Sequence, residues 1–98
     1  MKSILQDKKE CFYCGTTTGL NLHHIYAGSN RQRSDKNGFV VWLCFRCHRF
    51  LHDGGTYPVD ETMDKHLKIL CQKVYEKDFS REEFIKIIGK SYIKGDDK

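Results

Sequence analysis

Four cysteines form the most chemically specific pattern in this sequence. They occur as two Cys-x-x-Cys pairs, Cys11 with Cys14 and Cys44 with Cys47, and 29 residues separate the two pairs. Each pair brings two thiolates close enough to bind one zinc ion, and two pairs complete a tetrahedral four-thiolate site. Such a site has no free coordination position, so the ion would stabilise the fold and take no part in catalysis. The sequence therefore predicts a structural zinc, and the alternatives are redox dithiols or buried thiols without a ligand.

Four histidines occupy the same half of the chain as these cysteines, and their spacing suggests a second metal. His23 and His24 are adjacent in a predicted strand, so their side chains point to opposite faces and serve different purposes. His48 and His52 are four residues apart on one face of a predicted helix, a common spacing for metal ligands. A single histidine of this kind would be read as a structural residue, but the clustering of all four favours a site.

Basic residues are concentrated beside this cluster. Residues 28–59 carry five basic and two acidic side chains, whereas residues 60–98 carry nine of each. Phosphate groups of DNA would bind such a region without sequence preference and in a salt-dependent way. The candidates for DNA contact are Arg31, Arg33, Lys36, Arg46 and Arg49. The alternatives are a solvated basic loop and, for Arg46, a side chain that covers the zinc site.

The elements that must position these residues follow from local patterns in the first half of the chain. Alternating apolar and polar residues predict a strand over residues 20–25, and the apolar run predicts another over 39–43. The polar segment 26–37 predicts a loop between the two strands. A short helix over 47–53 follows, and Gly54 and Gly55 end it.

Two helices are predicted in the second half. Asp60 can cap the first of them, whose apolar face would consist of Met63, Leu67, Leu70 and Val74. A capping box at residues 80–83, with Phe79 and Phe84 as a hydrophobic staple, predicts the start of the second helix. Ile85 and Ile88 would face the core, Gly89 would end the helix, and Cys71 would pack as a small apolar residue.

Length and composition restrict the class of protein. The 98 residues allow one domain, 1–98, with the zinc and histidine region at 11–53 and the helices at 60–89 packed on it. The longest apolar run, 39–45, is far shorter than the roughly 20 residues that a membrane-spanning helix needs. We see no secretory signal at the start of the chain and expect a cytoplasmic protein. From these features we expect neither a membrane protein, nor a secreted protein, nor a multidomain enzyme.

The order of motifs resembles the HNH endonucleases. That order is the first cysteine pair, Leu22-His23-His24-Ile25, a polar segment, a strand ending at Leu43-Cys44, and then Cys47-His48. The resemblance covers residues 11–53 and is strongest to the small, zinc-stabilised HNH proteins of bacteriophages and prophages. Residues 80–84 and 89–92 are similar to the same phage proteins. The resemblance implies a small α+β fold built on a ββα-metal unit.

The resemblance also implies roles for individual histidines. His24 takes the position of the general base, and His23, His48 and His52 take the positions of metal ligands, as in the colicin-type sites of the family. The family pattern places an asparagine about five residues before Cys44, where this chain has Phe39. The backbone carbonyl of Phe39 is then a candidate to orient the His24 ring.

The implied activity is metal-dependent hydrolysis of DNA phosphodiester bonds, which leaves a 3′-OH and a 5′-phosphate. One divalent cation would be required, and all-imidazole ligation favours zinc or nickel whereas the family also uses manganese or magnesium. One site cuts one strand, so cleavage of both strands needs a homodimer or a phage protein partner. The alternatives are a catalytically weak zinc module that binds DNA or protein and, in a third class, a redox or zinc-storage protein.

Overall fold

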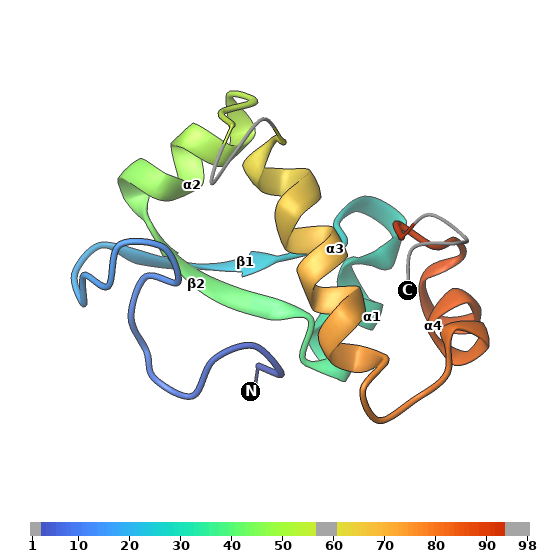
Figure 1. The fold of residues 1–98 in the computed structure, drawn as a ribbon. Helices are drawn as coiled ribbons and strands as arrows, with labels where there is room; N and C mark the ends of the chain where they lie inside the picture. Colours follow the sequence, from blue (N-terminus) through green and yellow to red (C-terminus); the bar gives the residue numbers. More distant parts are fainter. Residues whose placement is uncertain (1–2, 57–60, 94–98) are drawn as a thin grey trace.

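A computed structural model of the chain, described over residues 3–56 and 61–93, contains a two-stranded sheet and four α-helices (Figure 1). The small α+β class predicted from the sequence is confirmed at this level. No helix within the described ranges is long and apolar enough to cross a membrane. In chain order the elements are β1 (Leu20–His24), the 3₁₀ turn η1 (Gly28–Asn30), α1 (Arg31–Asn37), β2 (Val40–Cys44), α2 (Phe45–His52), α3 (Met63–Tyr75) and α4 (Arg81–Ile88).

The sheet is an antiparallel pair whose register places the two groups of candidate residues along it. Leu20 lies opposite Cys44 at one end, and His24 lies opposite Val40 at the other. Both strands were predicted within one residue of their observed bounds. Beyond the last strand pair, the N–H of Ile25 donates to the carbonyl of Phe39 at 3.0 Å, which extends the pairing by one step.

The segment predicted as a loop at 26–37 is mostly helical, so that prediction is wrong. It contains η1 and α1, and Gly38 ends α1 in the left-handed conformation at φ 76°. The buried residue of α1 is Ser34, whose hydroxyl donates to the carbonyl of Tyr26 at 2.7 Å and accepts from the N–H of Tyr26 at 3.1 Å. Because this helix buries a hydroxyl rather than an apolar side chain, its sequence lacks the hydrophobic period that identifies helices.

Helix α2 follows β2 without a connecting loop. It begins at Phe45, two residues before the predicted start, because Cys44 acts as the N-cap and its sulfur accepts from the N–H of Cys47. The helix ends at His52, and Asp53 is the C-cap. Leu51 is its buried residue, so most of its other side chains, including the histidines, are accessible or half-buried.

Helix α3 supplies much of the core. The predicted cap, Asp60, lies outside the described residues, and Thr62 is the observed N-cap, accepting from the N–H of Lys65 at 3.2 Å. Its buried residues are Met63, Leu67, Cys71 and Gln72, whereas Leu70 and Val74 are half-buried. The predicted apolar face is therefore correct for Met63 and Leu67. Further along the helix the buried face consists of Cys71 and Gln72 instead of Leu70 and Val74. Cys71 packs in the core as predicted.

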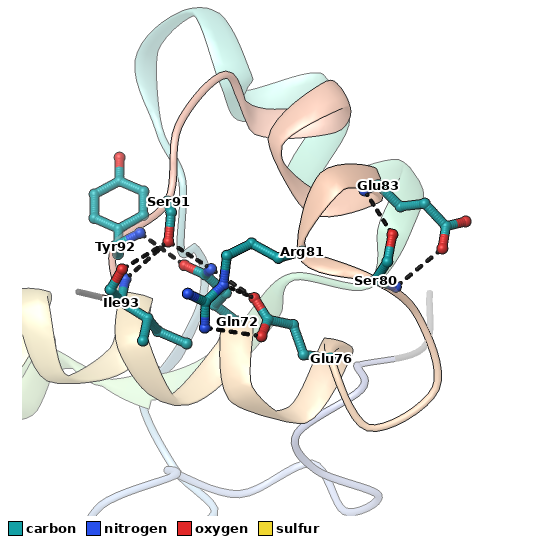
Figure 2. A network of polar contacts seen from close by, with 8 residues as sticks. All are labelled: Gln72, Glu76, Ser80, Arg81, Glu83, Ser91, Tyr92 and Ile93. Carbon is teal, nitrogen blue, oxygen red and sulfur yellow. Dashed lines mark hydrogen bonds and ion pairs between the residues drawn. The ribbon is translucent and has the colours of Figure 1, made fainter. Parts of the chain in front are cut away.

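Helix α4 begins with the predicted capping box, in which Ser80 and Glu83 exchange hydrogen bonds (Figure 2). Gly89 ends the helix in the left-handed conformation, also as predicted. Phe84 and Ile88 are buried, but Ile85 is 38% exposed, so its assignment to the core was wrong. Phe79 stacks on Tyr75 with ring centroids 4.7 Å apart and remains half exposed.

Aromatic rings join the sheet region to the C-terminal helices. Phe39 and Tyr26, which flank α1, contact Phe84 of α4 with ring centroids 5.9 and 5.4 Å apart. Polar contacts reinforce this packing (Figure 2): Arg81 pairs with Glu76, and the Gln72 amide bonds the Ser91 hydroxyl and the Tyr92 N–H. The ring contacts hold the residues that flank α1 against α4, and the polar contacts hold α3, α4 and the residues after α4 together.

Candidate functional site

The structure brings all four predicted zinc ligands together at one end of the hairpin. One ligand atom from each of Cys11, Cys14, Cys44 and Cys47 lies within 4.8 Å of the others, and the Cys14 and Cys44 sulfurs are 3.6 Å apart. All four are free thiols. Cys11 and Cys44 are buried, whereas Cys14 is exposed. The cluster could therefore bind a metal ion such as zinc.

Backbone groups of the two cysteine pairs point toward the sulfurs. The N–H of Cys14 donates to Cys11 Sγ at 3.5 Å, and the N–H of Cys47 donates to Cys44 Sγ at 3.4 Å. Burial acts to raise the pKa of Cys11, but hydrogen bonds from backbone N–H groups outweigh it and lower that pKa to about 6. Burial and the neighbouring sulfurs raise the pKa of Cys47. As thiolates, four sulfurs this close together would repel one another without a cation, so the donor set fits zinc.

A second cluster consists of His23, His48 and His52. One ring nitrogen of each lies within 4.8 Å of the others. The Nε2 atoms of His48 and His52 are 3.1 Å apart, and the His23 ring centroid is 5.2 Å from that of His48. The three residues predicted to share a metal are thus adjacent in space, although His23 lies on β1 and the other two lie on α2, which follows β2.

The chemistry of this second cluster fits a cation. His23 is 5% exposed, and its Nε2 atom is buried without a hydrogen-bond partner, which is costly unless another group binds there. Burial, followed by the proximity of His48, lowers the pKa of His23 to about 4, and burial also lowers the pKa of His48. Both rings are therefore neutral at pH 7, which is the form that binds metals.

The path of the chain explains how the histidines meet. His23 lies on β1 opposite Val41, and α2 leaves the far end of β2 and folds back over the sheet (Figure 1). One turn of helix separates His48 from His52, so both reach toward the same strand residue. The antiparallel hairpin and the helix that follows it are sufficient to assemble this cluster.

His24 points away from the three clustered histidines. Its Nε2 atom lies 3.2 Å from Asp35 Oδ1 of α1, and its side chain is 14% exposed. Phe39, which occupies the asparagine position of the family pattern, is fully buried among aromatic rings. Sequence reasoning missed Asp35, because the segment was predicted to be a loop and no pattern connects it to His24.

The predicted DNA-binding residues do not all line one hollow. Arg31, Arg33 and Lys36 are exposed on α1, and Arg31 lines a hollow together with His24, Gln32 and Asp35. Arg46 lines a separate groove next to the cysteine cluster, with Phe45 and Phe50. Arg49 lies 3.9 Å from Asp53 in an exposed ion pair. Of the five, Arg31 shares a surface hollow with the candidate catalytic histidine.

Comparison with known proteins gives no independent identification. No protein-family model matches the chain, and neither a curated protein nor a solved structure matches it. The functional proposal therefore depends on the residues and their geometry.

Proposed function

We propose that this protein is a metal-dependent DNA endonuclease of the HNH type. The observation that carries the proposal is the convergence of His23, His48 and His52, with His24 adjacent on the same strand. The order β1, β2, α2 supports assignment of this region to the ββα-metal fold, because the strand supplies one ligand and the helix two. The cysteine cluster, proposed to hold a structural zinc, lies at the other end of the hairpin.

Each residue of the site has a distinct task in phosphodiester hydrolysis. His24 accepts a proton from the attacking water, and its separation from the histidine cluster leaves its ring available for this task. His23, His48 and His52 bind the cation, and Arg31 binds a phosphate oxygen at the hollow that it shares with His24. A divalent cation bound by the three imidazoles would neutralise the charge that develops on the phosphate and the leaving 3′ oxygen. The products would be a 3′-OH and a 5′-phosphate.

A plasmid-nicking assay tests the proposal directly. We expect nicking by the wild type, its loss on chelation, and its return with added zinc, nickel, manganese or magnesium. His48→Ala should nick at least about 10-fold more slowly, because two imidazoles hold a cation less tightly than three. Excess metal should restore part of the rate.

Metal analysis supplies the control for His48→Ala. This variant should keep one zinc per chain, at the cysteine cluster, and should keep the wild-type circular dichroism spectrum. The matched control is His66→Ala on α3, where the imidazole lies 3.8 Å from Glu61 and outside both clusters. Equal nicking by His48→Ala and wild type, at limiting metal, would contradict the assignment of the second metal.

DNA binding should depend on α1. Replacement of Arg31 and Arg33 together by alanine should weaken binding at low salt and leave the fold intact, since both side chains are exposed. The slope of log affinity against log salt should fall by up to about two units if both residues contact phosphate. The double variant Lys73→Ala/Lys86→Ala removes two exposed charges from α3 and α4 and should leave the slope unchanged. An unchanged slope in the arginine variant would make α1 an ordinary solvated helix.

A second function is favoured by one observation. The Phe39 side chain is apolar and fully buried, so it cannot supply the hydrogen bonds of the asparagine in the family pattern. A catalytically weak zinc module that binds DNA or a protein partner would tolerate this substitution. Salt-dependent DNA binding without metal-dependent nicking would identify that second function.

A further inference from the structure

The unexpected contact between His24 and Asp35 suggests how the candidate base is oriented. We propose that Asp35 is the positioning residue of His24: its carboxylate accepts a hydrogen bond from Nε2–H and leaves Nδ1 free to take the proton from water. The supporting distance is 3.2 Å between His24 Nε2 and Asp35 Oδ1. This inference rests on the proposed function, in which His24 is the base.

The backbone that precedes Asp35 is firmly held. The preceding residue, Ser34, is fully buried and makes two hydrogen bonds to the backbone of Tyr26, while its carbonyl accepts from the N–H of Phe39 at 2.8 Å. At the start of α1, the Asn30 amide donates to the carbonyl of Ile88 at 2.9 Å. A carboxylate mounted on such a restrained turn can fix the angle of a ring that it contacts.

The choice of partner is informative. Arg31 lies one helical turn before Asp35, the usual spacing for an ion pair within a helix. Among the described residues, however, the Asp35 carboxylate contacts the His24 ring and makes no ion pair with Arg31. Arg31 lines the same hollow with Gln32, so the guanidinium is left to bind an anion while the carboxylate serves the imidazole. A carboxylate beside an anion site repels phosphate, so Asp35 does not assist phosphate binding. Orientation of the His24 ring is a role that accounts for its position.

The contact also identifies a group that can orient the His24 ring although Phe39 occupies the asparagine position of the family pattern. The Phe39 side chain is fully buried, and its carbonyl already accepts from the N–H of Ile25 at 3.0 Å. The acceptor for the His24 ring thus comes from α1 rather than from the start of β2. A carboxylate acceptor selects the Nε2–H tautomer, which leaves the lone pair of Nδ1 to accept a proton.

The experiment replaces Asp35 by asparagine, which keeps the shape of the side chain and removes its charge. We expect kcat for nicking to fall about 10- to 100-fold, the range typical of groups that orient a functional side chain by a hydrogen bond to it. KM and DNA affinity should stay the same or improve, because a charge that repels phosphate is removed. Glu82→Gln, which removes an exposed charge on α4, is the matched control and should leave kcat unchanged.

A second readout does not depend on activity. In ¹⁵N NMR of the zinc-loaded protein at neutral pH, the His24 ring, assigned with His24→Ala, should be protonated at Nε2 and bare at Nδ1. In Asp35→Asn the ring should become a mixture of tautomers, because an amide can accept from or donate to the ring nitrogen.

The outcomes separate the two proposals. A His24 ring protonated at Nδ1 in the wild type, or an unchanged kcat in Asp35→Asn, overturns the role of Asp35. If the wild type shows no nicking, the proposed function fails, and the tautomer of His24 still decides whether Asp35 orients the ring. A fall in DNA affinity equal to the fall in rate would show that Asp35 acts on binding, which also overturns the proposal.

Discussion

His24→Ala is expected to lose nicking activity by about 10²- to 10⁴-fold, which is the usual contribution of a positioned general base. His24 is the one member of the four-histidine set that the structure places outside the three-imidazole cluster. Its loss should therefore leave metal binding intact. The ring is largely covered by its neighbours but is not part of the apolar core, so its removal should also leave the fold intact.

The measurement compares initial nicking rates of His24→Ala and wild type on supercoiled plasmid, with zinc content, thermal melting and DNA affinity determined on the same samples. Added metal should not rescue this variant, in contrast to His48→Ala. His66→Ala again serves as the control, because it removes an imidazole from α3 at a distance from the site. Nicking by His24→Ala at the wild-type rate would contradict the endonuclease proposal and favour the DNA-binding zinc module.

Much of this candidate site could be predicted from the sequence because its candidate ligands lie in short, regular motifs. In the two Cys-x-x-Cys pairs, and in the histidine pair one helical turn apart, the spacing alone places both side chains within reach of one metal ion. The apolar patterns of β1 and β2 restrict the register in which the two strands pair. The convergence of His23 with His48 and His52 then follows from the β1–β2 hairpin and the helix that comes directly after it.

The parts that could not be predicted depend on contacts that no sequence motif indicates. Helix α1 was hidden by its polar composition, since its buried residue is a serine bonded to the backbone of Tyr26. The partnership of Asp35 with His24 exists only because that helix packs beside the end of β1. Phe84 of α4 packs against the rings of Tyr26 and Phe39, and Tyr75 of α3 packs against Phe39, contacts that sequence periodicity does not reveal.

Cys44→Ser is expected to unfold the domain. A chain of this size has a small core, and a structural zinc contributes on the order of 10 kcal/mol to the folding of small zinc domains. Cys44 is buried in the cluster at the junction of β2 and α2, so losing its thiolate weakens the site where the hairpin and the helix meet. We expect loss of bound zinc, loss of the cooperative thermal transition and reduced helical circular dichroism.

The choice of serine separates the effect of the metal from the effect of the helix cap. The Cys44 sulfur caps α2 by accepting from the N–H of Cys47, and serine is itself a preferred N-cap residue, so the cap survives the substitution. Cys71→Ala is the matched control: Cys71 is fully buried in the core but lies outside the cluster, so this variant should lose roughly 1 kcal/mol and keep its zinc. If Cys44→Ser melts at the wild-type temperature with full helical signal, the cluster does not hold a structural metal. The stability of the domain would then have to come from its apolar and aromatic core alone.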